Sequence, residues 1–143
     1  MLECKQAKFG SEEQLASIEL RRRILRRPLG LDLSPEQLAA EDFEFHLVGI
    51  QDSVVVACLV LTPLEGGHIK MRQVAVEPSL QGRGLGAELV RFSEVFAKDR
   101  GFTRMVLNAR DTAVPFYLKL DYEIEGEPFV EVTIPHRRMA KAL

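Results

Sequence analysis

The sequence predicts a single α+β domain, and three observations lead to that prediction. The first half of the chain contains helical signals followed by a hairpin pattern, whereas the second half alternates strands with helices. The 143 residues are 46% hydrophobic and 28% charged, a balance typical of a compact globular protein. A chain of this length buries about two-thirds of its unfolded surface, enough for one core. We expect an antiparallel front and a β-α-β-α-β rear within one domain, residues 1–143.

The first strand and the first helix are expected near the start of the chain. Residues 2–9 form the strand. Ser11, followed three residues later by Gln14, is a capping box that starts a helix, and Pro28 ends this helix. Its apolar residues at helical spacing, expected to face the core, are Leu15, Ile18 and Leu25.

A short helix and a three-stranded meander follow. The dipeptide Ser34-Pro35 opens the helix over residues 36–40. Residues 43–50 and 54–61 are expected to form an antiparallel hairpin, because a short polar turn joins two apolar runs. Two glycines then lead into a third strand, residues 68–76.

The rear of the domain is expected to alternate helices and strands. A helix over residues 85–100 ends at Gly101, where a left-handed cap residue belongs. The strand 104–108 follows, and then a helix over residues 111–120 in which Pro115 falls in the first turn. The inner stripe of the longer helix is Leu85, Leu89, Phe92, Phe96 and Ala97. The closing strands are residues 122–125 and 137–143, and the loops between them are marked by Gly126, Pro128 and Pro135.

The segment between the third strand and the long helix is the most informative part of the chain. It reads Gln81-Gly82-Arg83-Gly84-Leu85-Gly86 and follows a strand that Pro78 ends. Three alternating glycines let backbone N–H groups converge on one point, and the helix that begins there adds its positive dipole end. Donors and dipole together form an anion site, for which a diphosphate is a suitable ligand.

Other known glycine turns fit this segment less well. A Walker A loop ends in Gly-Lys-Ser/Thr, whereas Gly86 is followed by Ala87-Glu88. A dinucleotide fingerprint places its third glycine three positions after the second, whereas Gly84 and Gly86 are only two apart. The turn therefore does not support ATP use, and it makes NAD a second choice.

Composition argues against several classes of partner. The formal net charge is -2 and the pI is near 6.0, so the chain has no global basic field for nucleic acid or a membrane surface. The longest apolar run, residues 54–61, is too short to span a bilayer, and the amino end lacks a signal core. Cys4 and Cys58 form no Cys/His cluster, so we expect no disulfide and no metal. We expect a cytoplasmic location.

At the glycine turn the chain resembles the GNAT superfamily of acyl-CoA-dependent N-acyltransferases, whose pyrophosphate loop reads Gln/Arg-x-x-Gly-x-Gly/Ala. Asn108 and Phe116-Tyr117-Leu118-Lys119-Leu120-Asp121-Tyr122 extend the resemblance, the latter being similar to the family's Phe-Tyr-x-Lys-x-Gly-Phe segment. Asp121 stands where the family has glycine, at a position expected to be left-handed. The resemblance implies an α/β/α sandwich, with a mixed, mostly antiparallel twisted sheet of six to seven strands and helices on both faces.

The resemblance also implies that acetyl-CoA is a cosubstrate. Backbone N–H groups of the loop would hold the CoA pyrophosphate, and the preceding strand would pair with the pantetheine arm as if that arm were an added strand. The CoA-binding residues implied are Val74, Ala75, Val76, Gln81, Gly82, Arg83, Gly84, Leu85, Gly86 and Asn108. The matching tyrosine in the family protonates the departing thiolate, which implies that role for Tyr117. A core tyrosine without a catalytic role would show the same helical spacing.

The base that takes the proton of the acceptor amine stays open at this point. Glu41, Asp42, Glu44 and His136 are candidates, and none sits in a pattern that separates it from a surface charge. The tail Ile134-Pro135-His136-Arg137-Arg138-Met139 is similar to the Ile-Pro-His-x-x-Met pattern of the ElaA-like branch of the family. That similarity favours His136 as the second catalytic residue.

The first helix carries five closely spaced cations: Arg21, Arg22, Arg23, Arg26 and Arg27. Helical geometry distributes these side chains around the helix, so simple exposure to solvent is enough to explain their presence. Because the resemblance implies that this helix borders the acceptor cleft, recognition of an acidic acceptor is the alternative.

The function predicted is transfer of an acetyl or other acyl group from acyl-CoA to a primary amine in a ternary complex. The acceptor would be a small molecule or a peptide, and a homodimer stays open. The alternatives are a catalytically silent acyl-CoA-binding sensor or adaptor, and a docking surface built on the arginine helix.

Overall fold

The computed structural model describes residues 2–143, which divide into two compact units. The first unit contains the chain up to Thr62 together with Gln73–Ser93, and the second contains Pro63–Arg72 and Glu94–Leu143. Seven strands form one sheet in the order β1-β2-β3-β4-β5-β7-β6. The pair β4–β5 is parallel, whereas β1–β2, β2–β3, β5–β7 and β6–β7 are antiparallel. The predicted α+β class and the mixed, mostly antiparallel sheet are confirmed.

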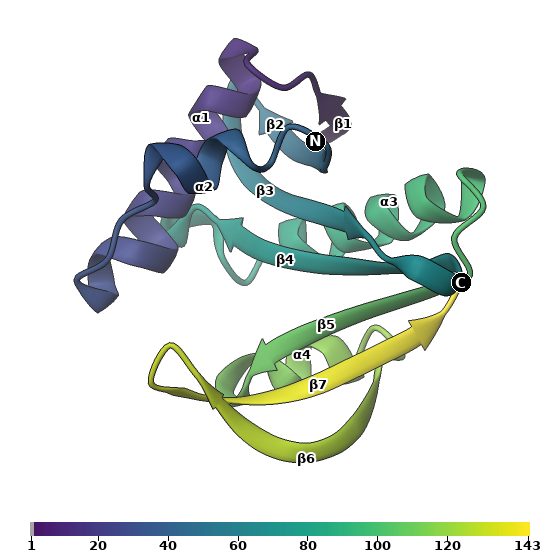
Figure 1. The fold of residues 1–143 in the computed structure, drawn as a ribbon. Coiled ribbons are helices and arrows are strands. Elements are labelled where there is room, and N and C mark those ends of the chain that lie inside the picture. Colours follow the sequence, from purple (N-terminus) through teal and green to yellow (C-terminus); the bar gives the residue numbers. More distant parts are fainter. Residues whose placement is uncertain (1) are drawn as a thin grey trace. The chain divides into compact units, whose positions relative to one another are not determined.

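The first unit begins with a strand, two helices and a hairpin (Figure 1). These elements are β1 (Glu3–Ala7), α1 (Glu12–Arg21), α2 (Pro35–Ala39), β2 (Phe45–Gln51) and β3 (Val54–Pro63), of which β3 ends just inside the second unit. At the start of α1 the Ser11 side chain accepts from the Gln14 amide at 3.2 Å. Ser34 and Gln37 form a full capping box at the start of α2. Both helix starts are therefore where the sequence predicts them.

The inner face of α1 differs from the predicted apolar stripe. Leu15 is exposed, and the side chains that α1 buries are Gln14, Ser17, Ile18, Leu20 and Arg21. Beyond α1 the chain continues as a short π-helix over Arg22–Arg26 and a 3₁₀-helix over Arg27–Leu29. The prediction for Leu15 is wrong because it counted apolar residues only, whereas polar groups with partners inside the protein occupy this face.

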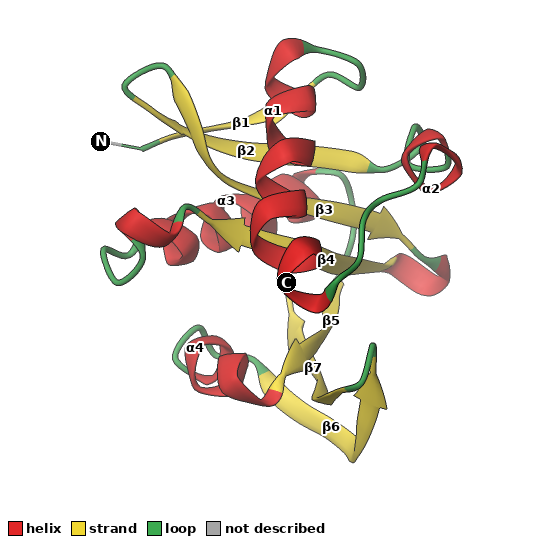
Figure 2. Ribbon diagram, turned by 90° about the vertical axis from the view of Figure 1, so that its left-hand side faces the viewer, coloured by secondary structure: helices red, strands yellow, loops and turns green. Residues whose placement is uncertain are grey.

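Two apolar clusters pack on the strands of the first unit. One joins Leu20 of α1 to strand residues that include Ala75, and the other joins Leu85 of α3 (Leu85–Asp99) to strand residues next to Val76. Ala75 and Val76 are neighbours in β4 (His68–Val76), and successive side chains of a strand point to opposite faces. The clusters therefore cover the two faces, as Figure 2 shows, with α1 in front of β2 and β3 and α3 behind.

The second unit is built around β5 (Arg104–Arg110) and β7 (Ile134–Ala142). Its other elements are α4 (Val114–Leu118), β6 (Glu123–Glu131), the first part of β4 and the last part of α3. Gly101 has a φ of 89°, in agreement with the predicted helix cap. Asp121 has a φ of 71°, so the left-handed backbone expected at this position is confirmed.

The predicted loops at Gly126, Pro128 and Pro135 are wrong, because these residues lie inside strands. β6 runs through Gly126 and Pro128, and β7 includes Pro135. The pairing register of β6 with β7 shifts between Glu125 and Phe129, and Gly126 is left-handed with a φ of 71°. A strand at the end of a sheet tolerates proline and a bulge, since one edge needs no ladder partner. Figure 1 shows β6 as a curved strand.

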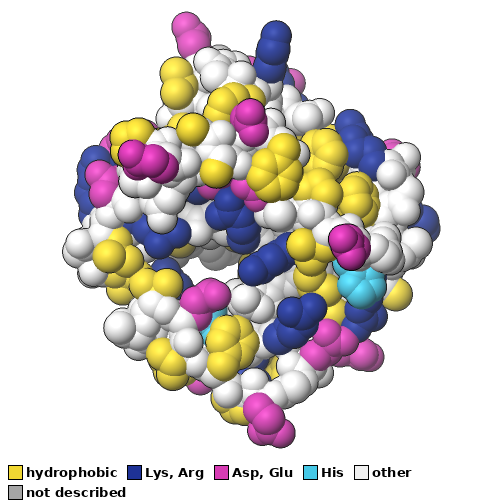
Figure 3. Space-filling model, viewed as in Figure 1, with side chains coloured by type: hydrophobic (Ala, Val, Ile, Leu, Met, Phe, Trp, Pro, Cys, Tyr) yellow, Lys and Arg dark blue, Asp and Glu magenta, His cyan; other side chains and the backbone are white. Residues whose placement is uncertain are grey.

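The structure of residues 2–143 bears on the expectations for membranes, metals, cysteines and surface charge. None of the helices in residues 2–143 has the length and apolar character needed to cross a membrane. In the same residues, no group of three or more His, Cys, Asp or Glu side chains is arranged to hold a metal ion. Cys4 and Cys58 are both free thiols. Acidic and basic side chains are interspersed on the face drawn in Figure 3.

The turn between β6 and β7 carries strain that a substitution should relieve. Val132 and Thr133 have φ values of 52° and 62°, although left-handed backbone disfavours β-branched residues. The double substitution Val132→Asn, Thr133→Gly supplies the residues that such a hairpin turn favours. We expect a gain in unfolding free energy of about 1–2 kcal/mol and a Tm rise of roughly 3–8 °C. Val132→Ile, which keeps the strain, is the control, and a double variant no more stable than this control would contradict the prediction.

Candidate functional site

At the end of β4, the backbone groups of successive residues point alternately toward β3 and away from it. The Ala75 amide faces the Cys58 sulfur, and the Glu77 amide donates to the Val56 carbonyl at 2.7 Å, so both point toward β3. Backbone groups alternate in direction along a strand. The N–H and C=O groups of Val74 and Val76 therefore point to the edge away from β3. An extended ligand can pair there with the groups that Gln81, which donates to the Val76 carbonyl, does not engage.

Cys58 is a buried thiol beneath this strand end. Its sulfur lies 3.7 Å from the Ser17 carbonyl oxygen, and burial raises the pKa of the thiol to about 12. The thiol is therefore protonated and unreactive at neutral pH. It contributes packing and a polar contact to the Ala75 amide, and no nucleophile.

The glycine turn is exposed and open on the side of its α-carbons. Gly82 and Gly84 are left-handed, with φ values of 81° and 80°. No protein atom lies within 4 Å of the position that a Cβ would take at either residue. Glycine is therefore needed for the backbone conformation, and the space beside the backbone is free for a ligand. The Gln81 side chain closes the turn by donating to the Val76 carbonyl at 3.1 Å.

The turn ends at the amino terminus of α3. The Glu88 amide donates to the Gly84 carbonyl at 3.0 Å, which makes Gly84 the residue that caps the helix. The amides of Leu85, Gly86 and Ala87 then have no carbonyl acceptor within the helix. A 15-residue helix also presents the positive end of its dipole here. The arrangement fits a diphosphate group.

The arginine run that begins at the last residue of α1 is paired with carboxylates. The ion pairs are Arg21–Glu41 at 2.7 Å, Arg22–Asp32 at 2.9 Å, Arg23–Glu77 at 3.0 Å and Arg27–Glu19 at 3.3 Å. The Arg23 guanidinium holds the pKa of the Glu77 carboxyl below its ordinary range. Since Arg21, Arg22, Arg23 and Arg27 each have a carboxylate partner, these residues do not form an open cationic docking face.

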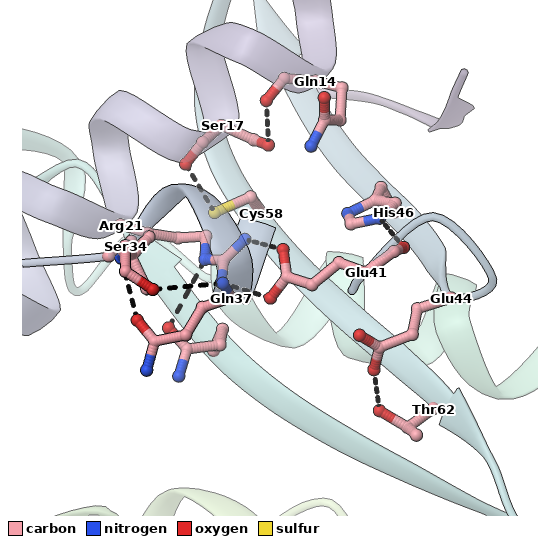
Figure 4. Close-up of polar contacts among 12 residues, drawn as sticks. Gln14, Ser17, Arg21, Ser34, Gln37, Glu41, Glu44, His46, Cys58 and Thr62 are labelled. Atoms are coloured by element: carbon pink, nitrogen blue, oxygen red, sulfur yellow. Dashed lines mark hydrogen bonds and ion pairs between the residues drawn. The ribbon is translucent and has the colours of Figure 1, made fainter. Parts of the chain in front are cut away.

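The acidic candidates for the base are engaged or exposed. Glu41 accepts two hydrogen bonds from the Arg21 guanidinium, at 2.9 and 2.7 Å, and both side chains are buried (Figure 4). Glu44 is buried and accepts from the Thr62 hydroxyl. Asp42 is exposed. A carboxylate held by a guanidinium fork is a poor proton acceptor, so Glu41 is disfavoured as a base.

Tyr117 lies in the second unit, inside an aromatic group. It is 7% exposed and makes edge contacts with Phe116 and Tyr122, at ring-centroid distances of 4.9 and 5.6 Å. The predicted inward direction of this ring is confirmed. Burial raises the pKa of the Tyr117 phenol well above its ordinary value, so the hydroxyl is protonated at neutral pH.

Asn108 and His136 share a carboxylate partner in the second unit. The Asn108 amide donates to Glu131 at 3.4 Å, and Nε2 of His136 lies 3.6 Å from the same carboxylate. Nδ1 of His136 lies 2.7 Å from the Ile134 carbonyl, an acceptor that assigns the proton to Nδ1. The ring stacks on Phe129 at 5.8 Å and is buried. Glu131, which the sequence analysis missed, therefore links two of the predicted residues.

The predicted residues fall into two sets. The strand end and the loop, from Val74 to Gly86, belong to the first unit, whereas Asn108, Tyr117 and His136 belong to the second. Each set has its own internal contacts, described above.

One feature of the first unit has no signal in the sequence. Gln73 of β4 has a φ of 56°, a left-handed conformation inside a strand, and its side chain accepts from Nε of the buried Arg21 at 3.4 Å. Arginine-rich helices and a glutamine in a strand are ordinary patterns. Only the left-handed backbone and the burial reveal that these residues are coupled.

Fold and turn together define an α+β protein with a mixed seven-stranded sheet and, between β4 and α3, a left-handed glycine turn whose geometry fits a diphosphate. Residues 13–122 match the model of the acetyltransferase (GNAT) family, and the chain belongs to this family.

Curated relatives match part of the chain. YjcF of Bacillus subtilis, described as an uncharacterized N-acetyltransferase, is 34% identical over 79 residues, which are 54% of this chain and 56% of the relative. The chain thus spans about half the length of that relative.

Solved structures share the whole fold. An acyl-CoA N-acyltransferase from Pseudomonas aeruginosa has a TM-score of 0.80 at 23% identity and covers 99% of both chains. ElaA of Escherichia coli has a TM-score of 0.83 at 20% identity, again over 99% of both chains. A GNAT family acetyltransferase from Elizabethkingia anophelis with acetyl-CoA bound has a TM-score of 0.77 at 16% identity, over 99% of this chain and 98% of that one. At these identities the likeness shows the fold and assigns no branch of the family.

Proposed function

We propose that this protein transfers an acetyl group from acetyl-CoA to a primary amine while both substrates are bound. The observation that carries the proposal is the left-handed glycine pair, Gly82 and Gly84, at the amino terminus of α3. Family membership and a neighbour of the same fold that holds acetyl-CoA support the cosubstrate. Since acetyl-CoA is a cytoplasmic metabolite, we propose that the reaction takes place there.

The proposed CoA site combines the loop and the strand end. The N–H groups of Gln81, Gly82, Arg83, Gly84, Leu85 and Gly86 would surround the diphosphate. Val74 and Val76 would pair with the pantetheine arm through the backbone groups that point away from β3, with Ala75 holding the strand to the core. Asn108 would contact the cosubstrate, as its match to the family implies.

The proposed reaction forms one bond and breaks one. The neutral amine attacks the thioester carbonyl, the C–N bond forms, and collapse of the intermediate breaks the C–S bond. The thiolate leaves with the proton of the Tyr117 hydroxyl, and the nitrogen loses its proton to a base. A backbone N–H at the end of β4 would polarise the carbonyl. The products are an amide and free CoA.

His136 is the proposed base or a contact to the acceptor. With its proton on Nδ1, the ring would accept a second proton on Nε2, which lies 3.6 Å from the Glu131 carboxylate. The acceptor itself, a small amine or a peptide, is to be identified with a panel of amines by measuring thiol release. Binding of acetyl-CoA without thiol release over a broad panel would favour a sensor or adaptor over a transferase.

Substitution Gly84→Glu tests the diphosphate site. A carboxylate and a strained left-handed residue would replace an open glycine at the helix start, so we expect acetyl-CoA affinity to fall at least about 100-fold, with the fold retained. Calorimetry against acetyl-CoA and against S-acetylpantetheine, which lacks the diphosphate, measures the effect.

Gly10→Glu is the matched control, because Gly10 is also left-handed, with a φ of 84°, and open around its Cβ position. Unchanged affinity in a folded Gly84→Glu variant would refute the diphosphate site.

Substitution Tyr117→Phe tests the proton donor. We expect turnover to fall about 100-fold or more while the Kd for acetyl-CoA stays within about twofold, because only the hydroxyl is removed. Tyr122→Phe controls for the loss of a buried tyrosine hydroxyl elsewhere in the same aromatic group. Full activity of Tyr117→Phe would eliminate the proposed role.

Substitution His136→Gln tests the base. We expect the limb of the pH–rate profile that rises with pH to disappear, because glutamine cannot accept the proton. The profile of thiol release between pH 5.5 and 9 would be compared with the wild-type profile. An unaltered pH dependence would show that His136 is not the base.

A further inference from the structure

We propose that Arg21 is a positioning residue, which holds Gln73 in its left-handed conformation and thereby aims the backbone of Val74 and Val76 at the cosubstrate. The proposal rests on the proposed function for its ligand, acetyl-CoA. Its structural part concerns residues of the first unit alone. We call Arg21, Glu41 and Gln73 the strand clamp.

The first step is the strain at Gln73. A φ of 56° is unfavourable for any residue with a Cβ, and such a residue persists only where its surroundings hold it. A left-handed residue within a strand is typical of a bulge, which changes the alternation of the residues after it. Gln73 directly precedes the residues that are proposed to pair with pantetheine.

The second step is the contact that holds Gln73. Nε of Arg21 donates to Gln73 Oε1 at 3.4 Å, and both NH₂ groups of the same guanidinium are fixed by Glu41 at 2.9 and 2.7 Å. The Arg21 and Glu41 side chains are 1% and 5% exposed. The planar fork thus sets the direction of the third donor, which a lysine ammonium could not do.

The buried pair Arg21–Glu41 needs an explanation other than stability. A buried ion pair is often no more stabilising than apolar residues of the same size, so stability alone does not explain it. A clamp that selects one backbone conformation does explain it. The selected alternation turns the Ala75 and Glu77 amides toward β3 and leaves the groups of Val74 and Val76 for the ligand.

Loss of the strand clamp should weaken the binding of acetyl-CoA by a predictable factor. Without the clamp, an L-residue at position 73 returns mainly to extended backbone with a negative φ. The conformation that directs Val74 and Val76 to the ligand then becomes a minor population. The apparent affinity for acetyl-CoA then falls by the same factor, about 5- to 30-fold. Glycine at position 73 has no such preference and needs no clamp.

The test compares two variants that both lack the Gln73 side chain. Gln73→Ala should weaken acetyl-CoA binding about 5- to 30-fold, whereas Gln73→Gly should stay within about threefold of the wild type. In the background Arg21→Met, Glu41→Leu, adding Gln73→Gly should restore the lost affinity. Should that double variant not fold, Arg21→Lys tests the same contact, because it keeps the charge and loses the fork. Arg22→Met with Asp32→Asn removes a neighbouring exposed ion pair and should change nothing.

A second readout needs no ligand. In Gln73→Ala the amides of Ala75 and Glu77 should exchange with deuterium about tenfold faster than in the wild type, and in Gln73→Gly they should exchange at nearly the wild-type rate. Equal affinity and equal exchange in the two variants would overturn the clamp. A wild type that does not bind acetyl-CoA would refute the proposed function instead, and the exchange comparison would still decide whether the clamp exists.

Discussion

The conformation of Gln73 is the constraint on which the candidate cosubstrate site depends. A strand has two sets of backbone groups, and a single left-handed residue decides which set faces which edge. In this protein Ala75 and Glu77 face β3, so Val74 and Val76 face the other way. The glycine turn that follows Pro78 has left-handed residues of its own, Gly82 and Gly84. The direction of the strand edge is thus set at Gln73, and the shape of the turn is set by its glycines.

We expect anion recognition in this chain to be local. The formal net charge is -2, and four arginines of the run that begins at the last residue of α1 are bound to carboxylates. A diphosphate would therefore be held mainly by N–H donors and by the dipole of α3. Backbone N–H donors have fixed directions, and their use costs no side-chain entropy on binding. This suits a site that must hold a long cosubstrate in one position along the strand. Arg23 pairs with Glu77 and so supports the end of β4.

Much of this arrangement follows from the sequence, because its signals are local. Capping residues, apolar periodicity and glycines predict the start of α1, the limits of β4 and the turn before α3. The turn residues and the inward Tyr117 were likewise predictable. The course of β6 was not predictable. Gly126 and Pro128 normally indicate a loop, and the sequence does not reveal that they lie in an edge strand, which tolerates them.

The parts that escaped prediction depend on burial of polar groups by residues distant in sequence. Arg21 is one of five similar arginines, and only its 0% exposure and its contacts with Glu41 and Gln73 distinguish it. Glu131 is likewise an ordinary acidic residue until β7 brings His136 beside it. Removing a guanidinium from water is costly, and an apolar side chain would fill the same space at less cost. The polar inner face of α1 is therefore best understood as a device that selects one backbone conformation in β4.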